Sequence, residues 1–202
     1  MLETLGPLGI VYLIAFILIG LTVHEFMHAY TGHLLGDSTA KDQGRISLNP
    51  LDHIDPIMTI GLPILTVLLF QAPILAAKPV PFDPARVRFG DMGAALVAAA
   101  GPLSNLVLAI LGVGLGGIIG MSQVLFMFVA LNVSLFIFNL IPIPPLDGSR
   151  VLYAFMPESV RDLMDQIEPV GLFIIFGLVL MGGFGGWLSG LNRAVLSLLG
   201  IG

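Results

Sequence analysis

The residues best suited to chemistry lie at positions 24–28, which read His-Glu-Phe-Met-His. Two histidines four residues apart on a helix are separated by about 400° of rotation, so both imidazoles emerge on one face and can hold one metal ion. Glu25 lies beside them and is free to accept a proton from a water that the metal activates. The spacing therefore predicts a metal-dependent hydrolase.

Two histidines do not complete a catalytic zinc site, because such sites generally use three protein ligands and keep a further position open. The chain has no cysteine, so the third ligand must be a histidine or a carboxylate. His33 would point to the opposite side of a continuing helix, since nine residues separate it from His24. His53 lies in a polar loop, where a histidine that bonds the loop is the more frequent case, and it is our reserve candidate.

Asp147 is the better candidate for the third ligand, because it directly follows a long uncharged stretch. An Asp before Gly148 more often makes a turn or a helix cap. The prolines within residues 142–145 change this interpretation, because irregular backbone at membrane depth is tolerated only when it is buried or lines a polar cavity. Asn139 could bind a substrate carbonyl or its own loop, or it could make a helix–helix hydrogen bond. Asn132, which lies two turns earlier, favours the helix–helix alternative.

The elements that position these residues are predicted to be membrane helices. Hydrophobic residues make up 56% of the 202-residue chain and charged residues 10%, whereas soluble domains contain about 25% charged residues. We expect an all-α polytopic integral membrane protein, with about four to six transmembrane helices in a single domain of residues 1–202. A net charge of -5 offers no basic stripe for nucleic acid, and the lack of cysteine excludes disulfides.

Uncharged stretches indicate where the spans lie. They cover residues 5–23, 57–77, 92–146 and 169–192. The third is long enough for two helices, at 93–118 and 121–141, and its glycines at 112, 116 and 120 favour close packing. The first lacks the charged start and cleavage site of a signal peptide, so we expect it to be retained.

Short polar segments lie between the spans. Alternating residues predict small membrane-associated β elements at 44–48 and 78–82. Residues 161–168 predict a short amphipathic surface helix.

The two motifs also constrain the topology. If His28 and Asp147 bind one ion, the chain must cross the membrane an even number of times between them. Helices 93–118 and 121–141 supply two crossings, so residues 57–77 are predicted to form a re-entrant segment. Seven basic residues then lie on one side, which the positive-inside rule makes cytoplasmic. They are Lys41, Arg45, Lys78, Arg86, Arg88, Arg150 and Arg161.

Taken together, the motifs resemble those of the site-2 protease family, the intramembrane zinc metalloproteases. That family pairs H-E-x-x-H on one membrane helix with Asn-x-x-Pro-x-Pro-x-Leu-Asp-Gly on a later one, matched here at 24–28 and 139–148 without substitution. Residues 49–56, 78–81 and 100–105 also look like the compact prokaryotic members. We expect no appended PDZ or CBS domain.

The resemblance implies one zinc ion per protomer, with His24, His28 and Asp147 as ligands, Glu25 as general base and Asn139 holding the substrate or oxyanion. It also implies regulated cleavage of membrane-embedded segments of other proteins. The expected location is a prokaryotic cell (inner) membrane, with the active site toward the cytoplasm. The implied partners are the bilayer and membrane-protein substrates, and a homo-oligomer is compatible with the sequence.

A substrate helix must unwind locally, because a helical backbone hides its carbonyls in hydrogen bonds. Pairing with an edge strand would hold the unwound substrate extended. We therefore expect substrate contacts at strand residues and at one helix residue, namely Gly44, Ile46, Lys78, Val80 and Asn105.

Two other function classes remain open. The CAAX prenyl endopeptidase type uses a later glutamate as third ligand, and here only Glu158 and Glu168 are available, neither in a comparable motif. A metal transporter or sensor would hold an ion with intramembrane charges. Such a protein has no need of Glu25 beside an open metal position, and the sequence shows no repeated halves with broken helices.

Overall fold

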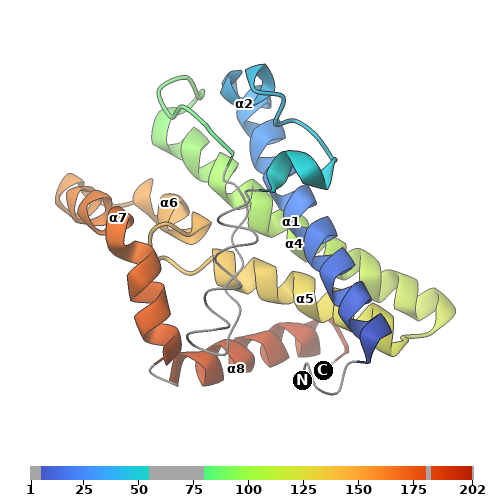
Figure 1. Ribbon diagram of the computed structural model, residues 1–202. Helices are drawn as coiled ribbons and strands as arrows, with labels where there is room; N and C mark the ends of the chain where they lie inside the picture. The colour runs from blue at the N-terminus through green and yellow to red at the C-terminus, as the bar shows by residue number, and fades with distance from the viewer. Residues whose placement is uncertain (1–5, 55–79, 181–182, 202) are drawn as a thin grey trace.

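The computed structural model describes residues 6–54, 80–180 and 183–201, and these residues form helices and loops without a strand (Figure 1). The prediction of an all-α membrane protein is confirmed. In chain order the helices are α1 (Pro7–Leu34), α2 (Thr39–Asp42), the 3-10 helix η2 (Pro50–His53), α4 (Gly90–Ile119), α5 (Gln123–Asn139), α6 (Asp147–Tyr153), α7 (Glu158–Leu180) and α8 (Gly183–Leu198).

Two of the described helices, α1 and α4, are long and apolar enough to cross a membrane. Their 28 and 30 residues give lengths of about 42 and 45 Å, which exceed the hydrocarbon thickness of about 30 Å. The predicted span at 169–192 is divided between α7 and α8. Only together, as a pair bent by 87°, are these two helices long and apolar enough to cross a membrane. The described residues thus provide two spans, or up to three, of the four to six predicted for the whole chain.

The remaining predicted spans have different outcomes. α5 has 17 residues, because Ser122 caps its start and the proline-containing loop follows its end. The predicted re-entrant segment at 57–77 lies outside the described residues.

α4 and α5 form a hairpin whose turn is made by Gly120 and Ser122. Gly120 has a φ of 89°, in the left-handed region that glycine favours. The Ser122 hydroxyl oxygen accepts a hydrogen bond from the Leu125 amide at 3.2 Å. A Cβ at Gly112 would lie 2.7 Å from Val129, so a larger residue there would push the two helices apart. The predicted close packing is therefore observed.

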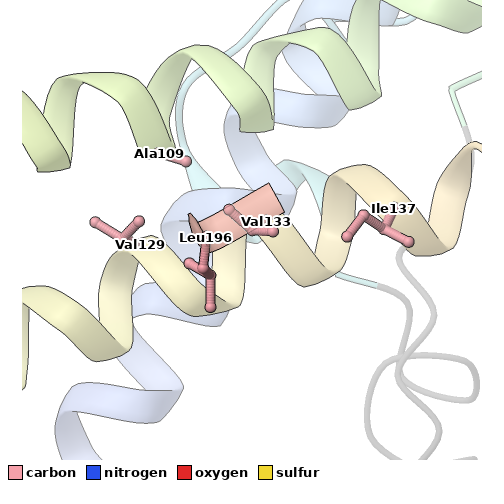
Figure 2. Close-up of a cluster of buried hydrophobic side chains, with 5 residues drawn as sticks. All are labelled: Ala109, Val129, Val133, Ile137 and Leu196. Carbon is pink, nitrogen blue, oxygen red and sulfur yellow. The ribbon is translucent and has the colours of Figure 1, made fainter. Parts of the chain in front are cut away.

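The apolar core lies where α4, α5 and α8 meet. Figure 2 shows five buried side chains that form it: Ala109, Val129, Val133, Ile137 and Leu196. In lipid the hydrophobic effect does not drive helices together, so the stability of such a cluster comes mainly from van der Waals packing. This core supports α5, the helix whose end leads to Asp147.

The prediction of small β elements is wrong for residues 44–48, where the chain takes turns and irregular loop. Side chains replace the expected ladder: the Ser47 hydroxyl oxygen accepts from the Asn49 amide at 3.0 Å, and Asn49 Oδ1 accepts from the Leu51 amide at 3.2 Å. Such local bonds compete with strand pairing. Residues 80–82 are also irregular, while 78 and 79 lie outside the described part.

The start of α7 is tied to the rest of the protein by Arg161. Its guanidinium donates to Asp91 at 2.5 Å and to the Met156 carbonyl at 2.8 Å, and lies 5.1 Å from the centre of the Tyr153 ring. The predicted surface helix at 161–168 is thus the first part of α7, which continues through Pro169. These contacts hold the beginnings of α4 and α7 at the same end of the protein.

Asp37 connects the end of α1 to the loop that leads into α4. The residue is 1% exposed and accepts hydrogen bonds from the Thr39 amide, the Thr39 hydroxyl and the Asp83 amide, at 2.9, 2.5 and 2.8 Å. Burial raises the pKa of Asp37, but the bonds from Thr39 and Asp83 outweigh this effect, so the pKa lies below its ordinary value. The ionised carboxylate therefore stabilises this junction.

We predict that Asp37→Asn lowers the thermal unfolding midpoint by several degrees at pH 7. Because the folded-state pKa is lowered, the stabilisation is present above the unfolded pKa of about 3.9 and is lost as the pH falls through the folded value. The difference between wild type and variant should therefore shrink below about pH 4. Unfolding scans in detergent at a series of pH values measure it, and a constant difference would contradict the role of the charge.

Candidate metal centre

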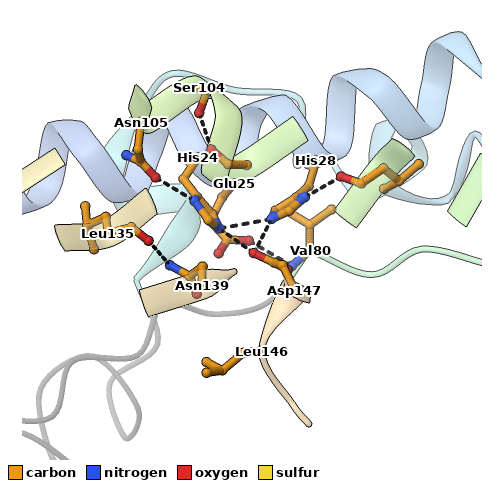
Figure 3. Close-up of polar contacts among 12 residues, drawn as sticks. His24, Glu25, His28, Val80, Ser104, Asn105, Leu135, Asn139, Leu146 and Asp147 are labelled. Atoms are coloured by element: carbon orange, nitrogen blue, oxygen red, sulfur yellow. Dashed lines mark hydrogen bonds and ion pairs between the residues drawn. The ribbon is translucent and has the colours of Figure 1, made fainter. Parts of the chain in front are cut away.

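The three predicted metal ligands converge, although Asp147 is far from the two histidines in sequence. Nε2 of His24 lies 3.1 Å from Oδ2 of Asp147, and Nε2 of His28 lies 3.3 Å from the same oxygen. The two Nε2 atoms are 3.0 Å apart. Figure 3 shows α1 and the start of α6 presenting these atoms to one point.

The cluster is largely removed from solvent. The side chains of His24, His28 and Asp147 are 5%, 11% and 19% exposed. Because ionisable groups are costly at membrane depth, such a cluster requires partners that balance its charge and lone pairs.

Hydrogen bonds on the far side of each imidazole determine which nitrogen carries the proton. Nδ1 of His28 lies 2.7 Å from the carbonyl oxygen of Val97, so it must donate. Nδ1 of His24 lies 2.8 Å from Oδ1 of Asn105 and likewise donates. In the neutral imidazoles both Nε2 atoms therefore carry lone pairs.

These lone pairs meet a carboxylate oxygen that lacks a donor. Oδ2 of Asp147 is buried and has no hydrogen-bond donor in the part of the chain that the structure describes. Lone pairs that face one another repel unless a cation lies between them. Two imidazole nitrogens and one carboxylate oxygen form a common ligand set of catalytic zinc, so these residues fit that ion.

Gly101 of α4 provides the space for this cluster. A Cβ at this position would overlap Nε2 of His28 and would lie 2.7 Å from Nε2 of His24. Both imidazoles are held by their Nδ1 bonds, so neither can move away freely. The absence of a side chain at Gly101 is therefore a requirement of the site.

The loop after α5 places Asp147. Its turns are closed by bonds from the Ile143 amide to the Ile141 carbonyl at 2.8 Å and from the Leu146 amide to the Ile143 carbonyl at 3.0 Å. α6 then begins at Asp147 itself. A Cβ at Gly148 would overlap the backbone of Leu140, so the Asp-Gly pair lets α6 begin directly against the end of α5.

Glu25 lies beside the cluster and lines a cavity of about 400 Å³ together with His28 and Asp147. It is 8% exposed, and its Oε2 accepts a hydrogen bond from the Val80 amide at 3.1 Å. The segment from Val80 to Phe82 borders the same cavity, as do Arg150 and Glu168, which form an ion pair at 2.6 Å. A peptide that reached this cavity would meet the carboxylate and the candidate ligands together.

The predicted substrate contacts have different outcomes. Val80 lines the cavity, whereas Gly44 and Ile46 are not among its lining residues, and Lys78 lies outside the described part. Asn139 ends α5, and its Nδ2 donates to the Leu135 carbonyl at 3.0 Å. Asn105 is 0% exposed, so it has no surface from which to contact a substrate in this structure.

The contact between Asn105 and His24 was missed by the sequence reasoning. The available signal was an asparagine inside a long apolar stretch, which is costly in lipid unless its amide is bonded. Asn132 supplies one of those bonds, because its Oδ1 accepts from Nδ2 of Asn105 at 3.1 Å. Asn132 thus makes a helix–helix hydrogen bond, whereas the Nδ2 bond of Asn139 to the Leu135 carbonyl lies within α5.

The alternative ligands lie in other environments. Nε2 of His53 donates to the Ser47 carbonyl at 2.8 Å, as expected for a histidine that bonds its loop. Glu168 is engaged by Arg150. Among the described residues, the group that could hold a metal consists of His24, His28 and Asp147 and includes neither His33 nor Glu158.

An all-helical membrane protein with this donor set and an adjoining glutamate has the features of a membrane metallopeptidase. Comparisons with known proteins agree. Peptidase family M50 matches residues 115–182, which include Asp147. The chain is 38% identical to the Bacillus subtilis protein named "Putative zinc metalloprotease YwhC", over 84% of this chain and 80% of that protein.

Mycobacterial relatives carry the name "Putative zinc metalloprotease Rip2". The protein from Mycobacterium tuberculosis (strain Erdman) is 32% identical over 98% of this chain and 80% of its own length. The protein from Mycolicibacterium smegmatis is 29% identical over 92% of this chain and 74% of its own length. No solved structure matches. The chain belongs to peptidase family M50, the site-2 protease family, and is an integral membrane protein.

We predict that Gly101→Ala weakens zinc binding by about 10- to 100-fold, because the added methyl group would displace both imidazoles from their supporting bonds. Gly114→Ala on the same helix is the matched control, since a Cβ there meets nothing within 4 Å. Competition with a fluorescent zinc chelator in detergent measures both affinities. Equal affinities of the two variants would show that Gly101 does not shape the site.

Proposed function

We propose that this zinc metalloprotease hydrolyses peptide bonds in or near the transmembrane segments of other membrane proteins. In this proposal His24, His28 and Asp147 hold one zinc ion per protomer, and Glu25 is the general base. The observation that carries it is the convergence of both Nε2 atoms and Oδ2 of Asp147 beside the cavity that Glu25 lines. Membership of family M50 supports the same assignment.

Bound zinc would supply a Lewis acid that polarises a carbonyl and makes a water acidic enough to lose a proton near neutral pH. Glu25 would receive that proton and deliver it to the leaving amine. The Val80 amide bond to Oε2 orients the carboxylate and leaves Oε1 to accept the proton. Nδ1 of His24 and Nδ1 of His28 would keep their protons in these steps, because they donate to Asn105 and to the Val97 carbonyl.

Asn139 and the segment from Val80 to Phe82 are proposed to hold the substrate. Nδ2 of Asn139 uses one of its protons on the Leu135 carbonyl, and the other is available to a substrate carbonyl or oxyanion. The extended chain of the substrate would lie along Val80 to Phe82, which border the cavity. Their backbone groups would give main-chain bonds that depend little on substrate sequence.

The active site is proposed to face the cytoplasm of a prokaryotic cell. Lys41 and Arg45 follow α1, and the Arg88 amide donates to the Leu35 carbonyl at 2.8 Å, so these basic residues share one end of the protein. Arg161 joins the same end through Asp91. The turn between α4 and α5 contains no charged residue. This asymmetry supports a cytoplasmic location of the basic end.

The test of the mechanism compares three variants in detergent. Glu25→Gln should retain zinc and lower kcat/KM for a transmembrane reporter by about 10²- to 10⁴-fold, the usual contribution of a general base. Asp147→Ala should lose near-stoichiometric zinc and with it the cleavage. His33→Ala, a histidine outside the cluster, should keep both. Cleavage by Glu25→Gln at the wild-type rate would remove the proposed mechanism, and full zinc retention by Asp147→Ala would remove the ligand assignment.

The topology is tested with single cysteines, which the native chain lacks. Lys41→Cys and Arg88→Cys should react with a membrane-impermeant maleimide from the cytoplasmic side. Gln123→Cys, at the other end of α4 and α5, should react from the opposite side. Reaction of Lys41→Cys and Arg88→Cys from different sides would contradict the shared end and the proposed even number of crossings.

A further inference from the structure

We infer that Asn105 is a positioning residue of the metal centre, which holds His24 in the Nδ1-protonated form and so presents its Nε2 lone pair to the ion. This inference rests on the proposed role of His24 as a ligand. The inferred role takes the place of the substrate contact that the sequence analysis expected for Asn105. Its consequence is a higher affinity of the site for zinc.

The orientation of the Asn105 amide follows from its neighbours. One atom of the amide lies 3.1 Å from the Gly20 carbonyl oxygen, which can only accept, so this atom must be the donor Nδ2. The other atom is then Oδ1, and it lies 2.8 Å from Nδ1 of His24. Since an amide oxygen can only accept, the proton is on Nδ1, and Nε2 is left with its lone pair.

Further contacts keep the amide in this orientation. Nδ2 of Asn105 also donates to Oδ1 of Asn132 at 3.1 Å, and Nδ2 of Asn132 donates to the Phe128 carbonyl at 2.9 Å. Both asparagines are 0% exposed. Turning the Asn105 amide by 180° would place its oxygen against the Gly20 carbonyl and its NH₂ group against His24. The network thus connects α5, through α4, to a single nitrogen on α1. Figure 3 shows its last step, the contact between Asn105 and His24.

Gly20 makes this approach possible. A Cβ at this position would lie 2.8 Å from Cδ1 of Leu135 and 3.2 Å from Oδ1 of Asn132. Without a side chain at Gly20, Nδ2 of Asn105 reaches the Gly20 carbonyl one turn before His24, and Oδ1 of Asn132 has room beside it. Gly20 and His24, one turn apart, therefore act together in this arrangement: Gly20 leaves room for the amide that orients His24, although it contacts neither the ion nor a substrate.

The experiment measures zinc affinity of the full chain in detergent by competition with a fluorescent chelator. Asn105→Leu removes the acceptor and should weaken binding by about 10- to 100-fold, the usual effect of losing such a partner. Asn105→Asp keeps an acceptor for Nδ1 of His24, so it should bind nearly as wild type. Gly20→Ala should weaken binding without altering any ligand or amide.

Asn192→Leu is the matched control, because it also removes an asparagine from an interhelical bond, in this case with the Ser134 hydroxyl at 3.2 Å. It should leave zinc affinity unchanged. Wild-type affinity of Asn105→Leu, or an equal loss in Asn192→Leu, would overturn the inference, since the second result would reflect general helix packing.

A second readout needs neither zinc nor substrate. In chelator-treated, ¹⁵N-histidine-labelled protein, which contains four histidines, His24 should show the Nδ1–H form in wild type and Asn105→Asp. In Asn105→Leu a share of the Nε2–H form should appear, and its absence would overturn the inference. This readout does not depend on proteolysis. If His24 shows the Nδ1–H form but the protein cleaves no substrate, the result contradicts the proposed protease function and leaves the inference about Asn105 intact.

Discussion

The constraint on which the rest of the structure depends is the meeting of three lone-pair donors in a largely buried, membrane-embedded site. Two imidazole nitrogens and one carboxylate oxygen lie about as close as hydrogen-bonded atoms, and neutral imidazoles that donate through Nδ1 place no proton between them. Such an arrangement suits a bound cation, which requires that each group is held in place from its far side. The Val97 carbonyl, the Asn105 amide and the start of α6 provide that support.

Close helix packing makes these supports possible. Gly20, Gly101 and Gly148 each stand where a Cβ would overlap or crowd a ligand, an asparagine or the backbone of a neighbouring helix. In lipid, helices associate through van der Waals contact and interhelical hydrogen bonds, and small residues allow both. The features that pack α1, α4 and α5 together are therefore the same features that orient His24 and His28.

Polar contacts at one end of the protein link this buried centre to the aqueous loops. Asp37 holds the Asp83 amide, and a few residues earlier the Val80 amide donates to Glu25. The carboxylate that is proposed to move the proton is thus oriented by a segment anchored outside the spanning part of α1. Substrate access and proton transfer would share the cavity that this segment borders.

The sequence by itself determined the helical class, the helix–helix packing through glycines, and the candidate ligands His24, His28 and Asp147. These follow from local rules: hydropathy selects membrane helices, and the four-residue spacing puts two imidazoles on one face. Only the tertiary structure decided that residues 44–48 form no strand, that α7 and α8 are bent apart, and that Asn105 faces His24. The physical reason is that each of these depends on a partner supplied by folding; His24 and Asn105, for example, are 81 residues apart in the chain. No local period encodes such a pairing.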